Sequence, residues 1–128
     1  MITEIWGERF DKSELLEKVD GDNEIVELLI ESARLQIPQY INDIRNHFES
    51  FEGDFPSDCE QIKHCAHAIK GSAFNLSFHR LGNIAKALEF SIKEHESKNI
   101  STEEALSDCI ELIKLLDAEW TALLKLLN

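Results

Sequence analysis

A histidine, a lysine and a glycine stand within about one helical turn of each other, at His67, Lys70 and Gly71. An exposed imidazole nitrogen can accept a phosphoryl group when it is neutral, as imidazole largely is near neutral pH. An ammonium group three residues further on could offset the charge of that phosphoryl group. Gly71 would leave room for a partner molecule to approach. Since glycine in a helix interior costs about 1 kcal/mol relative to alanine, its presence there indicates a use.

The residues around this group predict the helix that would present it. Apolar residues recur at intervals of three and four, which is typical of a helix packed into a bundle. At about 100° per residue, His67 lies on the solvent side of such a helix, close to Lys63 and Phe74. The apolar positions are Cys59, Ile62, Ala66, Ile69, Ala73 and Leu76.

This stretch resembles the signature of the histidine-containing phosphotransfer (HPt) domains of bacterial phosphorelays. The resemblance implies an all-α fold, an antiparallel up-down four-helix bundle, to which the sequence adds a short N-terminal helix. It also implies that Nε2 of His67 is the phosphoacceptor and that the partner carries its phosphoryl group on an aspartate of a receiver domain. The matching residues are Ala66-His67-x-x-Lys70-Gly71-Ser72-Ala73-x-Asn75-Leu76, then Leu81 and Leu88-Glu89.

Further site residues follow from this resemblance and from the positions of the residues on the predicted helices. Nδ1 of the imidazole needs an acceptor to hold the ring and its tautomer, and Glu89 is the candidate, because the family often carries Gln or Glu at this point. Lys70 would stabilise the charge of the phosphoryl group, while His64, Gly71 and Phe74 would contact the partner. Phe74, like Ser77 and Phe78, stands where the family often has a small residue. It could equally fold over the helix end as peripheral core, which leaves the end of the central helix open.

Composition narrows the class of protein. The chain has 128 residues, 43% of them hydrophobic, and a net charge of −12. We interpret residues 1–128 as a single domain, large enough for its own core. The negative charge argues against nucleic acid or an anionic membrane surface as a partner. No stretch approaches the roughly 20 apolar residues that span a bilayer, so we expect no membrane association, and we expect a monomer.

Motifs that are missing from the sequence bear on whether the chain binds nucleotides or metals. There is no glycine-rich nucleotide-binding loop and no acidic metal cluster on a strand. We therefore expect no cofactor or metal of its own and no autokinase activity, with magnesium supplied by the partner's receiver domain. Cys59 and Cys109 fall in phase with apolar helix faces, as buried reduced thiols would, and no basic-then-apolar leader opens the chain. These features predict a cytoplasmic protein.

The bounds of the other helices are predicted from the spacing of apolar residues and from residues that commonly cap helices. We predict a bundle over approximately residues 22–127, with residues 1–20, including a short helix capped by Asp11, packed on one end. The first long helix runs from 22 to about 50 with Pro38 inside it, and the central helix runs from Ser57 or Asp58 to near Leu76. Ser77 would cap the next helix, and Ser101 would open the last. The apolar face of that last helix is predicted at Leu106, Cys109, Ile110, Ile113, Leu116, Trp120, Leu123 and Leu127.

Three functions are compatible with this sequence. The first is a phosphorelay intermediate that accepts a phosphoryl group on His67 from the receiver aspartate of a hybrid sensor kinase and passes it to a response regulator. The second is a non-catalytic helical interaction module, which has no reason to keep His67, Lys70 and Gly71 together. The third is the phosphoacceptor fragment of a chemotaxis-type histidine kinase, which would need a kinase core after the bundle. A metal site at His64 and His67 would need further ligands from other segments.

Overall fold

In the computed structural model, residues 6–49 and 55–127 are described, and all regular elements in these two stretches are helices. The all-α class is therefore confirmed for the described part of the chain. None of its helices is long and apolar enough to cross a membrane. The helices are α2 (Lys12–Lys18), α3 (Asn23–Glu49), α4 (Phe55–Asn75), α5 (His79–Glu96) and α6 (Thr102–Leu127).

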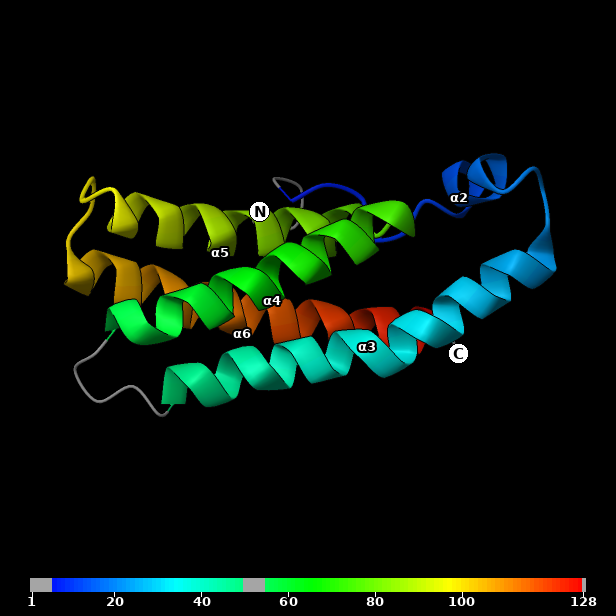
Figure 1. Cartoon of the computed structure of the whole chain (residues 1–128). Helices are drawn as coiled ribbons and strands as arrows, with labels where there is room; N and C mark the ends of the chain where they lie inside the picture. Colours follow the sequence, from blue (N-terminus) through cyan, green and yellow to red (C-terminus); the bar gives the residue numbers. More distant parts are fainter. Residues whose placement is uncertain (1–5, 50–54, 128) are drawn as a thin grey trace.

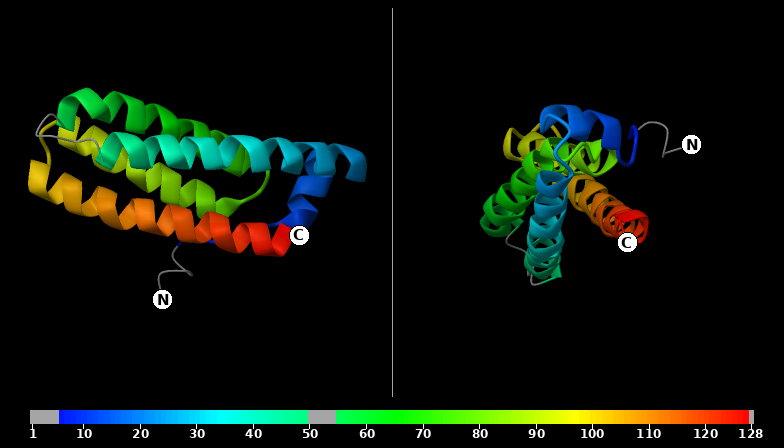
Figure 2. Two further views of the ribbon diagram at one scale, coloured as in Figure 1. Left: turned by 90° about the horizontal axis from the view of Figure 1, so that it is seen from below. Right: turned by 90° about the vertical axis from the view of Figure 1, so that its right-hand side faces the viewer.

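The four long helices surround one apolar core. Helix α4 packs against α3 and α5, and α6 packs against α5 and α3. Successive long helices run in opposite directions (Figure 1), and the two views of Figure 2 show all four side by side with α2 across one end. Each long helix buries an apolar stripe as its three-and-four spacing requires. Fully buried side chains come from all four, among them Ile37, Ile69, Leu88 and Leu116.

The segment before α3 is fastened to the end of the bundle where α4 leads into α5. Asp11 caps α2, with Oδ1 accepting a hydrogen bond from the Glu14 amide at 3.0 Å. Nζ of Lys18 donates to the carbonyl of Phe74 at 2.9 Å, across to the end of α4. Arg9 forms a two-point ion pair with the buried Glu119 of α6, at 2.8 and 3.1 Å. Polar contacts of this segment therefore reach both α4 and α6.

Two predicted boundaries of α4 and α5 are wrong. Helix α4 begins at Phe55 rather than at Ser57 or Asp58, because a proline is tolerated in the first turn of a helix. Ser77 does not cap α5; the N-cap is Phe78, which makes no side-chain cap bond. Ser77 is fully buried in a left-handed conformation (φ 59°), and its hydroxyl donates to Glu14 at 2.8 Å. The hydroxyl is thus used to hold α2.

Other sequence-based expectations have mixed outcomes. Helix α3 continues through Pro38 as predicted, whereas most of the predicted loop 51–56 lies outside the described residues. Ile110 is 44% exposed, so its assignment to the buried face of α6 is wrong. Cys59 and Cys109 are buried as predicted, and burial raises the pKa of the Cys109 thiol to about 12.

Candidate functional site

Helix α4 presents His67 to solvent. The imidazole side chain is 66% exposed, while Ala66 and Ile69 on the opposite face of the same helix are fully buried. The rotation of α4 predicted from its apolar spacing therefore agrees with the structure. His64, one turn earlier, and Gly71, one turn later, are exposed too.

One carboxylate of the neighbouring helix holds both His67 and Lys70. Oε2 of Glu89 lies 2.9 Å from Nδ1 of His67, and Oε1 accepts a hydrogen bond from Nζ of Lys70 at 2.7 Å. The Glu89 side chain is only 7% exposed, because it lies where α5 packs on α4. The structure thus brings together all three residues that the sequence assigned to the reactive centre. Of the two ring nitrogens of His67, it is Nδ1 that has a hydrogen-bond partner among the described residues.

The bonds and charges around Glu89 lower the pKa of its carboxyl group. Burial, the largest single influence, raises that pKa, but the hydrogen bonds from Lys70 and His67 and the nearby positive charges together hold it below its ordinary value of 4.5. Lys93 adds to the effect, with Nζ 3.6 Å from Oε2. Glu89 is therefore a carboxylate at neutral pH. The sequence reasoning missed Lys93, although its position four residues after Glu89 on one helix was a usable signal.

A shallow pocket of about 260 Å³ adjoins the imidazole on its N-terminal side. Lys63 lines it, and its ammonium bridges Glu60 at 3.0 Å and Glu96 at 2.9 Å. Lys93 and His64 line the same pocket. Amino groups therefore lie around His67 although the protein as a whole is acidic.

Gly71 lies on an open surface, whereas Phe74 packs against the neighbouring helix. A Cβ added at Gly71 would meet nothing within 4 Å, so this glycine is not required for close packing against a neighbouring helix. The ring of Phe74 lies against Gly82 of α5, where an added Cβ would come within 2.6 Å of it. Phe74 is thus partly buried over the start of α5, and its contact with a partner stays a prediction.

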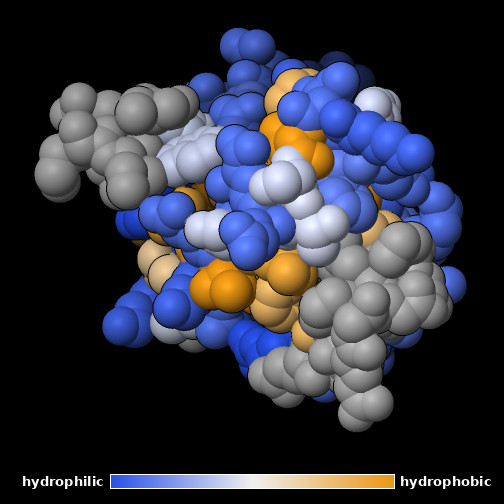
Figure 3. Space-filling model, turned by 90° about the vertical axis from the view of Figure 1, so that its left-hand side faces the viewer, coloured by the Kyte–Doolittle hydropathy of each residue, from blue (hydrophilic) through white to orange (hydrophobic). Residues whose placement is uncertain are grey.

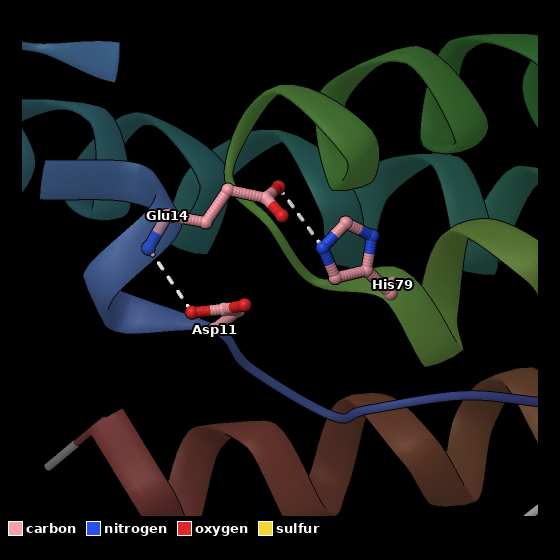
Figure 4. Close-up of side chains that lie close together, drawn as sticks. All are labelled: Asp11, Glu14 and His79. Carbon is pink, nitrogen blue, oxygen red and sulfur yellow. Dashed lines mark hydrogen bonds and ion pairs between the residues drawn. The ribbon is translucent and has the colours of Figure 1, made fainter. Parts of the chain in front are cut away.

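A second polar cluster lies at the α2 end of the bundle and consists of Asp11, Glu14 and His79 (Figure 4). Their potential ligand atoms all lie within 4.8 Å of one another. However, Oε1 of Glu14 already receives bonds from Ser77 at 2.8 Å and His79 at 3.0 Å. The Lys18 ammonium, 3.3 Å from the same oxygen, opposes a bound cation. The hydrogen bond from Ser77 is the largest cause that lowers the pKa of Glu14, and the cluster fastens α2 to the start of α5.

The fold and the site define a helical domain with one exposed histidine held by a buried carboxylate. The family model of the Hpt domain matches residues 24–125, a range that runs from the start of α3 almost to the end of α6. The chain therefore belongs to the Hpt domain family, whose members are phosphotransfer modules of two-component signalling, not classical enzymes, and interact with receiver domains. Searches of curated proteins and of solved structures gave no match.

Proposed function

We propose that this chain is a phosphorelay intermediate, with His67 as its phosphoacceptor. In this proposal a four-helix up-down bundle carries the phosphoryl group from a receiver aspartate of a hybrid sensor kinase to a response regulator. The observation that carries the proposal is the exposed imidazole of His67, bonded through Nδ1 to Glu89 at 2.9 Å. That bond leaves the other ring nitrogen, Nε2, for the reaction.

The transfer step can be written with all bonds accounted for. With its proton on Nδ1, the ring has a lone pair on Nε2, which attacks the phosphorus of the receiver's aspartyl phosphate. The N–P bond forms as the P–O bond to the aspartyl carboxylate breaks, and the carboxylate leaves with that electron pair. The ring gains positive charge in this step, and the Glu89 carboxylate on Nδ1 would stabilise it. The reverse order of events returns the group to an aspartate of the next receiver.

Lys70 is proposed to stabilise the phosphoryl group on His67. Its ammonium is now 2.7 Å from Glu89 and lies one helical turn from the imidazole, within reach of a phosphoryl oxygen after a side-chain rotation. Magnesium would be supplied by the receiver domain, and this chain would bind no nucleotide. His64, Gly71 and Phe74 would contact that domain, with the bare backbone at Gly71 permitting its approach. We further propose that the protein acts as a monomer in the cytoplasm.

The decisive experiment is label transfer from a purified receiver domain carrying a labelled aspartyl phosphate. We expect an acid-labile label on the wild type and none on His67→Gln, with equal helical content by circular dichroism. Labelling of the Gln variant at the wild-type level would refute the proposal. Binding of the receiver without transfer would support a non-catalytic interaction module. Labelling only by a kinase core with ATP would support the chemotaxis-type alternative.

A further inference from the structure

A mostly apolar groove runs along α5 and α6, on a different face of α5 from the one that meets α4. Its volume is about 510 Å³, and its apolar lining includes Ile100, Leu112 and Leu115. Phe90 lines it as well and is 62% exposed, an unusual exposure for such a large apolar side chain. Hydrophobic side chains are also open to solvent at the end of the molecule that holds the α5–α6 turn (Figure 3). Such a surface favours an apolar partner.

Charge specifies the partner further. Four carboxylates line the groove, from Glu94 on α5 and from Glu104, Asp108 and Glu111 on α6, and none of the described residues that line it is a lysine or an arginine. An occupant must therefore be apolar on the side that faces the groove and positively charged at its edges.

The length of the groove indicates the shape of the partner. Its lining on α6 extends from Glu104 to Leu115, which at about 1.5 Å per residue is roughly 16 Å, or about three helical turns. We propose that this groove binds a basic amphipathic helix of another protein, with apolar residues at helical spacing against Phe90 and Leu112 and with Lys or Arg beside the carboxylates.

The exposed apolar face of α3 in a second copy of this chain matches the groove poorly. The exposed apolar side chains of α3 include Leu28 and Leu35, at 70% and 73% exposure. Exposed Glu24 and Glu27 lie beside Leu28, and exposed Glu31 lies one turn before Leu35. The α3 of a second copy would therefore bring carboxylates against the carboxylates of the groove.

The groove is also separate from the proposed phosphoryl-transfer centre. Glu89 is buried against α4, whereas the next residue, Phe90, projects about 100° further round α5. The inference therefore does not depend on transfer at His67, and it can be tested without a receiver domain.

The probe is a fluorescein-labelled synthetic peptide of about 14 residues, roughly four helical turns, with leucines on one face and lysines on the others. Fluorescence anisotropy with the full chain should show saturable binding. A scrambled peptide of the same composition, and a peptide with glutamate in place of lysine, should each bind at least about tenfold more weakly.

Matched variants locate the site. Phe90→Ala and the double change Glu104→Gln with Glu111→Gln should each weaken binding about tenfold. The controls on α3 are Leu28→Ala, which removes an apolar side chain about as exposed as Phe90, and the double change Glu24→Gln with Glu27→Gln, which removes the same charge. Each control should change affinity less than about twofold.

Three results of the binding assay would overturn the proposal. The first is no saturable binding of the lysine peptide, and the second is equal binding of the scrambled peptide, which would indicate attraction by charge alone. The third is a loss of affinity in the α3 controls as large as in the groove variants. Sedimentation of the wild type alone supplies a further check. A dimer that Phe90→Ala dissociates would make the groove a self-association surface instead.

Discussion

Nδ1 of His67 lies 2.9 Å from Oε2 of Glu89, across the contact between α4 and α5. The other oxygen of the same carboxylate bonds to Lys70 at 2.7 Å. Because Glu89 is nearly buried and belongs to a different helix, the packing of α4 on α5 fixes both the imidazole ring and the ammonium group. Variants of these three residues should therefore show separately how much phosphotransfer depends on the orientation of the imidazole and how much on the positive charge of Lys70.

The first prediction concerns Glu89 as a positioning residue. Glu89→Ala removes the acceptor of Nδ1, and we expect phosphotransfer to His67 to slow by about 10- to 100-fold, as the loss of an orienting partner does for metal-ligating histidines. Glu89→Gln keeps an acceptor oxygen without the charge and should recover part of the rate. Rapid-quench transfer from a phosphorylated receiver measures both. If Glu89 were needed only for folding, the loss of transfer rate in each variant would follow the fall in its melting temperature. Transfer at the wild-type rate by Glu89→Ala would rule out the orienting role.

The second prediction concerns Lys70. Lys70→Ala should slow transfer or shorten the lifetime of phosphohistidine, because the charge beside the phosphoryl group is lost. Lys70→Arg should retain most of the effect. Lys93→Ala is the matched control, since the Lys93 side chain is 57% exposed and its Nζ lies 3.6 Å from the other oxygen of Glu89. Equal losses in Lys70→Ala and Lys93→Ala would show that general positive charge is sufficient.

The reactive centre was predictable from sequence because periodicity and residue type coincide there. The spacing of Ala66 and Ile69 fixed the rotation of α4, so the exposure of His67 followed. Glu89 was harder, since pairing it with His67 required knowing that α5 is the neighbour of α4. Lys93 was missed although it follows Glu89 at helical spacing.

Other features could not be read from sequence because tertiary contacts override local signals. Ser77 looks like a helix cap, yet its hydroxyl bonds to Glu14, which lies 63 positions earlier in the chain. Ile110 fits the apolar spacing of α6, yet it is 44% exposed, since neighbouring turns of that helix already supply the core. Both cases depend on which segment packs nearby, and periodicity does not contain that information.

The third prediction is a pH dependence of stability. The pKa of Glu89 is lowered in the folded protein: burial raises it, but the hydrogen bonds from Lys70 and His67 together with the charges of Lys70 and Lys93 lower it by more. Its carboxylate therefore stabilises the fold above the ordinary pKa of 4.5, and this contribution is lost as the pH falls through the lower folded-state value. Urea unfolding measured from about pH 6 to about pH 3 should show a steeper loss for the wild type than for Glu89→Gln. Parallel curves would contradict the assignment.

The fourth prediction uses two helical glycines that have opposite surroundings. Gly71 is open, so Gly71→Ala should raise the free energy of unfolding by about 1 kcal/mol through helix propensity. At Gly82 a methyl group would meet the Phe74 ring at 2.6 Å, so Gly82→Ala should lower stability by about 1–3 kcal/mol. Chemical denaturation measures both changes.

The same pair of glycines tests why Gly71 is present. Combined with Phe74→Ala, the Gly82→Ala change should lose most of its cost, because the ring that it meets is gone. Gly71→Ala should slow transfer from a phosphorylated receiver even though the protein is more stable, because its methyl group projects from the exposed face of α4 beside His67. If Gly71→Ala is more stable and transfers at the wild-type rate, partner approach does not explain the glycine. A slower and more stable variant would mean that Gly71 serves the encounter with the receiver at the expense of the fold.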